Sequence, residues 1–241
     1  MEFTYAAYRD LIHLLKEKRY SFCNYHNYTD FDKCVILRHD VDNSVKKALD
    51  LAQVEKEEGV KSTYYVLLNT DFYNPASKKM GDMIRRIFEM GHDIGLHFDE
   101  VAYQGKNPGA LAEFIQKEAK ILSEVCEVPI RSFSMHRPNR LTIEKNLQVP
   151  GLINSYGQEF FHEFKYLSDS RRHWREPVLD IIENGAYDKL HILTHAFWYG
   201  EQEETIKEAI GRFVRSANTE RYEQMAENIR AIEEILLRNE V

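Results

Sequence analysis

The chain has little cysteine, no long apolar run and no excess of positive charge. Its three cysteines, Cys23, Cys34 and Cys126, are too few and too scattered for a disulfide framework or a Cys-x-x-Cys metal site. No stretch approaches the roughly 18 apolar residues that a membrane-spanning helix needs. The net charge of −7 disfavours binding to the phosphates of nucleic acid. We therefore expect no disulfides, no membrane span and no nucleic-acid partner.

The sequence also lacks the features that would divide it or export it. The amphipathic residues 1–20 carry charges at Glu2, Arg9 and Asp10, where a signal peptide would need an uninterrupted apolar stretch. This predicts a cytoplasmic protein. Without repeats or Pro/Gly/Ser-rich linkers, residues 1–241 are predicted to form a single domain with C-terminal helices over 201–241, broken near 216–219. The apolar residues of that last segment permit either packing on the domain or association into an oligomer.

Short runs rich in β-branched and aromatic residues alternate with longer stretches of helical spacing. Strands are expected at 34–41, 62–68, 93–97, 131–136, 152–156, 165–169 and 189–195. Between them, Ser44 is predicted to cap one helix that ends at Gly59, and Pro108 to open another. This alternation predicts parallel strands with helical crossovers, either in an open doubly wound sheet or in a barrel.

Five of the seven expected strands end in ionisable residues. These are Asp40 and Asp42, His97 and Asp99, His136 and Arg137, Asp169, and His195. Because the carboxyl ends of parallel strands meet at one edge of the sheet, their side chains are expected to converge there. Carboxylate and imidazole groups suit zinc or another divalent transition ion, and three such ligands leave a position open for water.

Asp40 and Asp42 lie two residues apart on a strand, so both should point to the same face. Two like charges so close repel each other unless one binds a cation. We expect one carboxylate to ligate the metal and the other to accept a proton from its water. The alternative for Asp42 is a helix N-cap. His39 should face the opposite side of the strand, and His92 and His191 are predicted to be structural.

Five segments in order then reveal a resemblance over roughly residues 34–198. They are RHDVD (38–42), GHDIGLHFD (91–99), HRPN (136–139), SDSRRHW (168–174) and LTHAFW (193–198). The set resembles the five motifs of the polysaccharide deacetylases, the NodB-like carbohydrate esterases. The resemblance implies an α/β fold, a distorted (β/α) barrel with about seven parallel strands.

The resemblance also implies roles for individual residues. Asp40 would be the general base and His195 the general acid, while Asp42 and His97 would hold a divalent metal, expected to be Zn²⁺. Trp174 and Trp198 would shape the acyl pocket, Asp169 would orient a catalytic group, and Arg137 would contact substrate.

Two departures from the family pattern affect these roles. The position where the family usually offers a second metal-binding His is Val101, which cannot ligate a metal. We expect the third ligand to be His136, with Asp99 as the second choice. Since His136 stands where the family's third motif usually has Arg, either Arg137 or Arg38 would have to orient the base.

The implied activity is metal-dependent hydrolysis of an N-acetyl group on an amino sugar or glycan precursor, in bacterial O-antigen or capsule biosynthesis. The missing export signal points to an acetylated sugar substrate that is nucleotide- or lipid-linked. One alternative keeps the metal but hydrolyses a non-sugar amide. The other is a catalytically inactive sugar-binding protein of the same fold.

Overall fold

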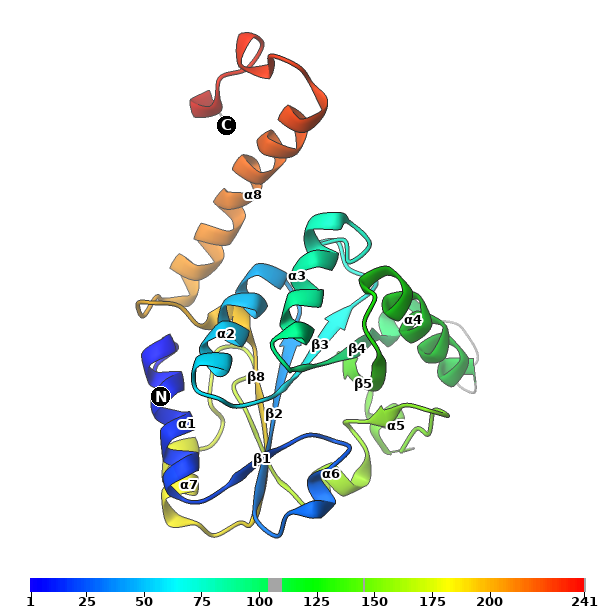
Figure 1. Cartoon of the computed structure of the whole chain (residues 1–241), viewed down its shortest axis with the longest axis vertical. Coiled ribbons are helices and arrows are strands. Elements are labelled where there is room, and N and C mark those ends of the chain that lie inside the picture. Colours follow the sequence, from blue (N-terminus) through cyan, green and yellow to red (C-terminus); the bar gives the residue numbers. More distant parts are fainter. Residues whose placement is uncertain (104–109, 145, 241) are drawn as a thin grey trace. The chain divides into compact units, whose positions relative to one another are not determined.

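The computed structural model describes residues 1–103, 110–144 and 146–240 (Figure 1). By their internal contacts these residues form two compact units, Met1–Glu201 and Gln202–Val241. The larger unit contains all the strands and every residue to which the motifs assign a role. Pro108, which was predicted to open a helix, lies outside the described residues.

The larger unit is built on parallel strands that follow one another in a curled half-barrel (Figure 1). In spatial order they are β6 (Ile153–Asn154), β5 (Ile130–His136), β4 (Asp93–Asp99), β3 (Thr63–Leu67), β2 (Cys34–Val41), β8 (Lys189–Thr194) and β7 (Lys165–Ser168). All seven predicted strands are present, and the distorted (β/α) barrel is confirmed. The sequence reading missed β1 (Ser21–Cys23), a three-residue strand that pairs only with the start of β2.

Helices and short turns connect the strands. They are α1 (Tyr5–Glu17), η1 (Tyr28–Asp30), α2 (Val45–Glu57), α3 (Lys78–Glu89), η2 (Glu100–Tyr103), α4 (Leu111–Cys126), α5 (Arg140–Glu144), α6 (Gln158–His162), α7 (Val178–Asn184) and η4 (Ala196–Trp198). As predicted, the Ser44 hydroxyl caps α2 by accepting a hydrogen bond from the Lys47 amide at 3.3 Å. Gly59, just past the end of α2, has the positive φ of +68° that glycine adopts without strain.

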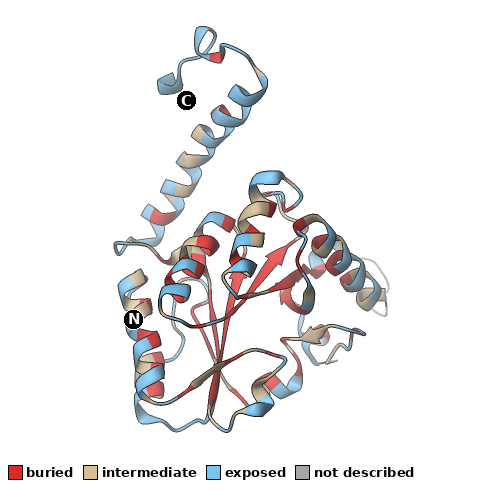
Figure 2. Ribbon diagram, in the orientation of Figure 1, coloured by how far each residue is buried: buried red, intermediate tan, exposed pale blue. Residues whose placement is uncertain are grey.

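The alternation of β2 separates two apolar layers. Val35, Leu37 and Val41 belong to the main core, which includes the buried faces of the helices, whereas Cys34 and Ile36 belong to a second cluster with aromatic residues. Every residue of β2 is buried (Figure 2). The apolar residues of these layers fill both faces of the strand from Cys34 to Leu37, and the polar residues Arg38, His39 and Asp40 follow them in its second half.

A buried carboxylate ties the first helices to the sheet. Glu55 of α2 has no exposed surface and accepts hydrogen bonds from the hydroxyls of Tyr8 (2.7 Å), Ser62 (2.6 Å) and Tyr64 (2.7 Å). Glu55 also lies 2.9 Å from His39 Nε2 and 3.6 Å from His92 Nδ1, so His39 faces away from the site as predicted. Burial alone would raise the pKa of Glu55, but the charge of His39 and its hydrogen bond outweigh burial and lower the pKa to about 2.

The smaller unit consists of α8 (Ile206–Asn228) and the turns η5 (Ile232–Glu234) and η6 (Arg238–Glu240). The predicted break near 216–219 is wrong, because α8 runs through these residues without interruption. Thr205 and Glu208 form a capping box at its start. Ser216 fits inside the helix because its hydroxyl donates to the Phe213 carbonyl at 2.8 Å.

The three cysteines are free and buried. Within the described ranges, no helix combines the length and the apolar character that crossing a membrane requires.

Candidate active site

Three predicted ligands meet at the carboxyl ends of β2, β4 and β5. Asp42 Oδ1 lies 3.2 Å from His97 Nε2 and 3.3 Å from His136 Nδ1, and the two histidine nitrogens are 3.1 Å apart. Asp42 Oδ1 is buried and has no hydrogen-bond partner among the described residues. A buried carboxylate oxygen without a partner is costly unless a cation or water completes its surroundings.

The spacing of these atoms fits a tetrahedral metal ion. Donors about 2.0–2.1 Å from a tetrahedral ion are about 3.3 Å apart, close to the three distances seen here. One carboxylate and two imidazoles also form a common ligand set for a zinc site that keeps an open position. Asp42, His97 and His136 could therefore hold such an ion with little rearrangement.

The orientation of His97 depends on a residue that the sequence reading missed. His97 Nδ1 lies 2.5 Å from Ser134 Oγ, which leaves Nε2 directed toward Asp42. Ser134 is fully buried and stands directly opposite His97 in the pairing of β4 with β5. The available signal was its position two residues before His136, which places both side chains on one face of β5.

Asp40 lies beside the ligands and is held by an arginine from its own strand. Arg38 Nε and Nη2 donate to the two oxygens of Asp40, both at 2.9 Å, and neither side chain is appreciably exposed. Asp40 Oδ2 is 3.6 Å from His97 Nε2. Burial would raise the pKa of Asp40, but the charges of Arg38 and His97 lower it below its ordinary value. Of the two arginines considered for orienting the base, Arg38 is the one that contacts it.

The Arg38 guanidinium is itself enclosed by aromatic rings. Its central carbon lies 4.7 Å from the centre of the Tyr156 ring and 5.1 Å from that of Tyr65. A buried cation next to π faces and a bidentate carboxylate has little freedom to move. The carboxylate of Asp40 is therefore fixed in direction.

His195 and Asp169 form a second pair close to Asp42. Asp169 Oδ1 is 2.6 Å from His195 Nδ1, and the carboxylate also accepts from the His195 amide and the Tyr199 hydroxyl. His195 Nε2 is 3.9 Å from Asp42 Oδ2. Burial would lower the pKa of His195, but the charge of Asp169 and its hydrogen bond raise it to about 9. In this arrangement Asp169 holds Nδ1 of His195, and Nε2 is directed toward the ligand cluster.

The remaining predicted residues lie in the segments that follow the strands. Arg137 has a positive φ of +51° and forms an ion pair with Asp99, so Asp99 is outside the cluster of possible ligands. Trp174 is half-buried and borders a cavity of about 450 Å³. Trp198 lies in η4, where its ring packs against Phe197 with the centres 4.8 Å apart. Their contacts with substrate remain predictions.

Comparison with known proteins finds similarity in structure alone. No protein-family model and no curated protein matches the sequence. Among solved structures, the CE4 domain of a multidomain xylanase from the hindgut metagenome of Trinervitermes trinervoides is 16% identical, covering 79% of this chain and 85% of that one, with a TM-score of 0.46. A family 4 carbohydrate esterase from Bacillus anthracis is 15% identical, covering 86% and 82%, with a TM-score of 0.43.

A CE4 family pseudoenzyme from Bacillus anthracis is similar too, at 15% identity, with coverage of 77% and 60% and a TM-score of 0.44. At identities of 15–16% and TM-scores below 0.5, these likenesses say nothing about activity. The resemblance to the polysaccharide deacetylases therefore rests on the five motifs of the sequence.

Proposed function

We propose that this chain is a metal-dependent hydrolase that removes an N-acetyl group from an amino sugar. The observation that best supports the proposal is the arrangement of Asp42, His97 and His136, whose ligand atoms lie 3.1–3.3 Å apart around an unpartnered carboxylate oxygen. A purely structural strand edge has no need of such a cluster. The two flanking groups, Asp40 and His195, supply a proton acceptor and a proton donor.

A divalent ion bound by the three ligands would polarise the amide carbonyl and lower the pKa of a coordinated water. Asp40 is ionised and immobilised by Arg38, which suits it to accept the proton of the attacking water. The charge of Asp169 raises the pKa of His195, which suits its Nε2 to donate a proton to the departing amine. Asp169 holds His195 through Nδ1 and keeps Nε2 free for this transfer.

The finer features of the proposal are the metal and the substrate. Zinc is proposed because one carboxylate and two imidazoles match its preferred ligands. The substrate is proposed to be a nucleotide- or lipid-linked N-acetyl sugar of O-antigen or capsule biosynthesis, handled in the cytoplasm. This part of the proposal comes from the motif resemblance.

Metal content tests the site directly. Purified protein loaded with zinc and then dialysed should retain about one ion per chain, and His97→Ala should lose it. His26→Ala removes an exposed histidine outside the cluster and should retain the ion. A wild-type protein that takes up no metal, measured by inductively coupled plasma mass spectrometry, would contradict the proposal.

Acetate release tests the reaction. The zinc-loaded protein is assayed against a panel of nucleotide-activated N-acetyl sugars and N-acetylated oligosaccharides, with simple non-sugar N-acetyl amides alongside. Asp40→Asn should keep the metal and lose about 10²–10⁴-fold in turnover, since it removes the proton acceptor. Binding of sugar without any acetate release would favour the inactive sugar-binding protein. Acetate release from the simple amides alone would favour a metal-dependent hydrolase of a non-sugar amide.

A further inference from the structure

The smaller unit carries an exposed apolar stripe along α8. Ile206, Ile210, Val214 and Met225 are 46%, 44%, 62% and 45% exposed. At 3.6 residues per turn they lie within an arc of about 100° on one face of the helix. Ala217, at the middle of α8, shares that face and is also exposed. A stripe of this kind on a helix marks a surface that another apolar surface covers.

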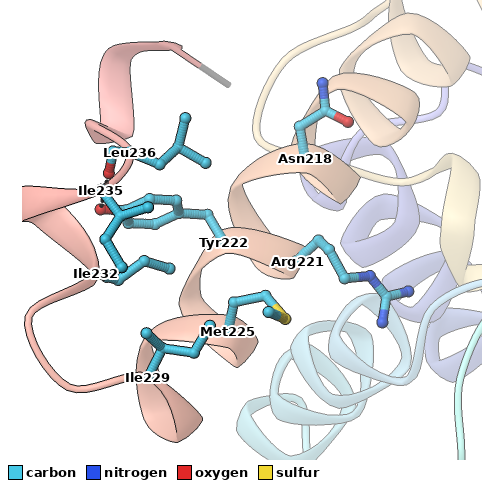
Figure 3. Close-up of a pocket in the computed structure, with 8 residues that line it drawn as sticks. All are labelled: Asn218, Arg221, Tyr222, Met225, Ile229, Ile232, Ile235 and Leu236. Atoms are coloured by element: carbon cyan, nitrogen blue, oxygen red, sulfur yellow. Dashed lines mark hydrogen bonds between the residues drawn. The ribbon is translucent and has the colours of Figure 1, made fainter.

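The second half of the same unit contains an apolar groove. The C-terminal tail, defined here as residues 229–240, folds back along α8 and leaves a cavity of about 440 Å³ (Figure 3). Its lining is Asn218, Arg221, Tyr222, Met225, Ile229, Ile232, Ile235 and Leu236. The Tyr222 hydroxyl donates to the Leu236 carbonyl at 3.0 Å, and Arg238 pairs with Glu223 at 2.7 Å, so two polar contacts join the tail to α8.

The stripe and the groove complement each other when two copies of α8 run antiparallel. An axis between Ala217 and Asn218 places Ile206 of one copy opposite Ile229 of the other. It also places Ile210 opposite Met225. The apolar first half of each helix then lies along the groove of its partner. One two-fold axis makes both contacts at once, as a closed dimer requires.

The charges along α8 favour the same direction of pairing. Residues 206–217 contain three basic residues and one acidic residue, whereas residues 218–228 contain three acidic residues and one basic residue. Within the described part of the smaller unit, Lys207, Arg215, Glu220 and Glu227 form no ion pairs. Antiparallel helices bring halves of opposite charge together, while parallel helices would bring like charges together.

We propose that α8 and the C-terminal tail form a homodimer interface, in which the stripe of each copy occupies the groove of the other. The helix is about 34 Å long, and Ala217 at the crossing lets the two axes approach closely. The contact is independent of the proposed catalytic chemistry, because none of its residues belongs to the candidate active site.

The oligomeric state of the full chain tests this. Sedimentation equilibrium should show a dimer that dissociates on dilution. Ile210→Glu should raise the dissociation constant by about 100-fold or more, since it places a charge opposite the apolar Met225 side chain of the other copy, at two symmetric positions. Thr219→Glu introduces the same charge in the same helix on the opposite face and should leave the dimer intact. Circular dichroism should show equal helix content in both variants.

Cross-linking tests the direction of the pairing. A single cysteine introduced as Ala217→Cys should be joined to its counterpart by a short bis-maleimide, whereas Ile206→Cys should not. The native cysteines are buried and contribute little background. Any of three results would overturn the proposal: a monomer at every concentration, a dimer that Ile210→Glu does not weaken, or efficient cross-linking at position 206. The first result is also the one expected if the stripe packs on its own chain or on another protein.

Discussion

Replacing Glu55 by glutamine should destabilise the protein at neutral pH, and the loss of stability should be much smaller in acid. Glu55 is fully buried, and its ionised form is stabilised by His39 and three hydroxyl donors. The amide of Glu55→Gln has nearly the same size and can still accept hydrogen bonds. The substitution therefore removes the charge and preserves most of the packing.

The magnitude follows from the pKa of Glu55, which is about 2 in the folded protein against an ordinary value of 4.5. One pKa unit corresponds to about 1.4 kcal/mol, so the ionised carboxylate contributes about 3 kcal/mol at neutral pH. A carboxylate with a lowered folded-state pKa contributes its full stability above the unfolded-state pKa. The contribution is lost as the pH falls through 4.5 toward 2, and about 1 kcal/mol remains near pH 3.

Urea denaturation of the metal-free protein at several pH values measures this. The difference in unfolding free energy between wild type and Glu55→Gln should be about 3 kcal/mol at neutral pH and should shrink to about 1 kcal/mol near pH 3. Glu89→Gln, an exposed substitution in α3, should leave the acid dependence unchanged. A difference for Glu55→Gln that is the same at both pH values would refute the reasoning, since it would come from packing and not from charge.

Three further substitutions test the sheet and the site. Gly95→Ala should lower the free energy of unfolding by about 2–3 kcal/mol, because a Cβ there would lie 2.3 Å from a ring carbon of Tyr65. A stability equal to that of wild type in urea denaturation would contradict that contact. Ser134→Ala should weaken zinc binding about 10–100-fold in a chelator competition, since His97 loses the group that orients it, and unchanged affinity would show that the serine is dispensable. Asp169→Asn should retain the metal and lower kcat more than it raises KM, because the proposed acid loses its negative partner; a change in KM alone would argue against that role.

The positions of the main strands along the chain could be predicted well from the sequence. The expected strand at 34–41 coincides with β2, and that at 189–195 with β8 to within a residue. These runs are apolar and β-branched because the strands are buried on both faces, so the local pattern records the environment. The three-residue β1 has no such pattern, since it is extended only through its pairing with β2.

The ligand cluster was predictable for a topological reason. In a parallel sheet every strand ends at the same edge, so ionisable residues at strand ends converge without any knowledge of the exact geometry. Asp42, His97 and His136 come together in this way. The sequence could not decide between His136 and Asp99, because the choice depends on the side-chain directions, and in the structure Asp99 pairs with Arg137 instead.

Some features follow only from the tertiary structure. Glu55 begins the charged segment EKEEG (55–59), a pattern typical of a solvated helix end. It is nevertheless buried, because α1, β2 and β3 supply its hydrogen-bond donors. The local sequence around Arg38 likewise does not show that this arginine is buried. It holds Asp40 in place because the fold encloses its guanidinium with tyrosine rings.

The sequence by itself therefore determined the strands, the helical crossovers and the set of ionisable residues at the strand ends. Each of these is written in local patterns of burial and spacing. The tertiary structure alone decided which arginine holds Asp40, which serine orients His97 and which face of α8 is left exposed. Those depend on contacts between residues far apart in the chain, and their distances are set by register and packing that no local pattern records.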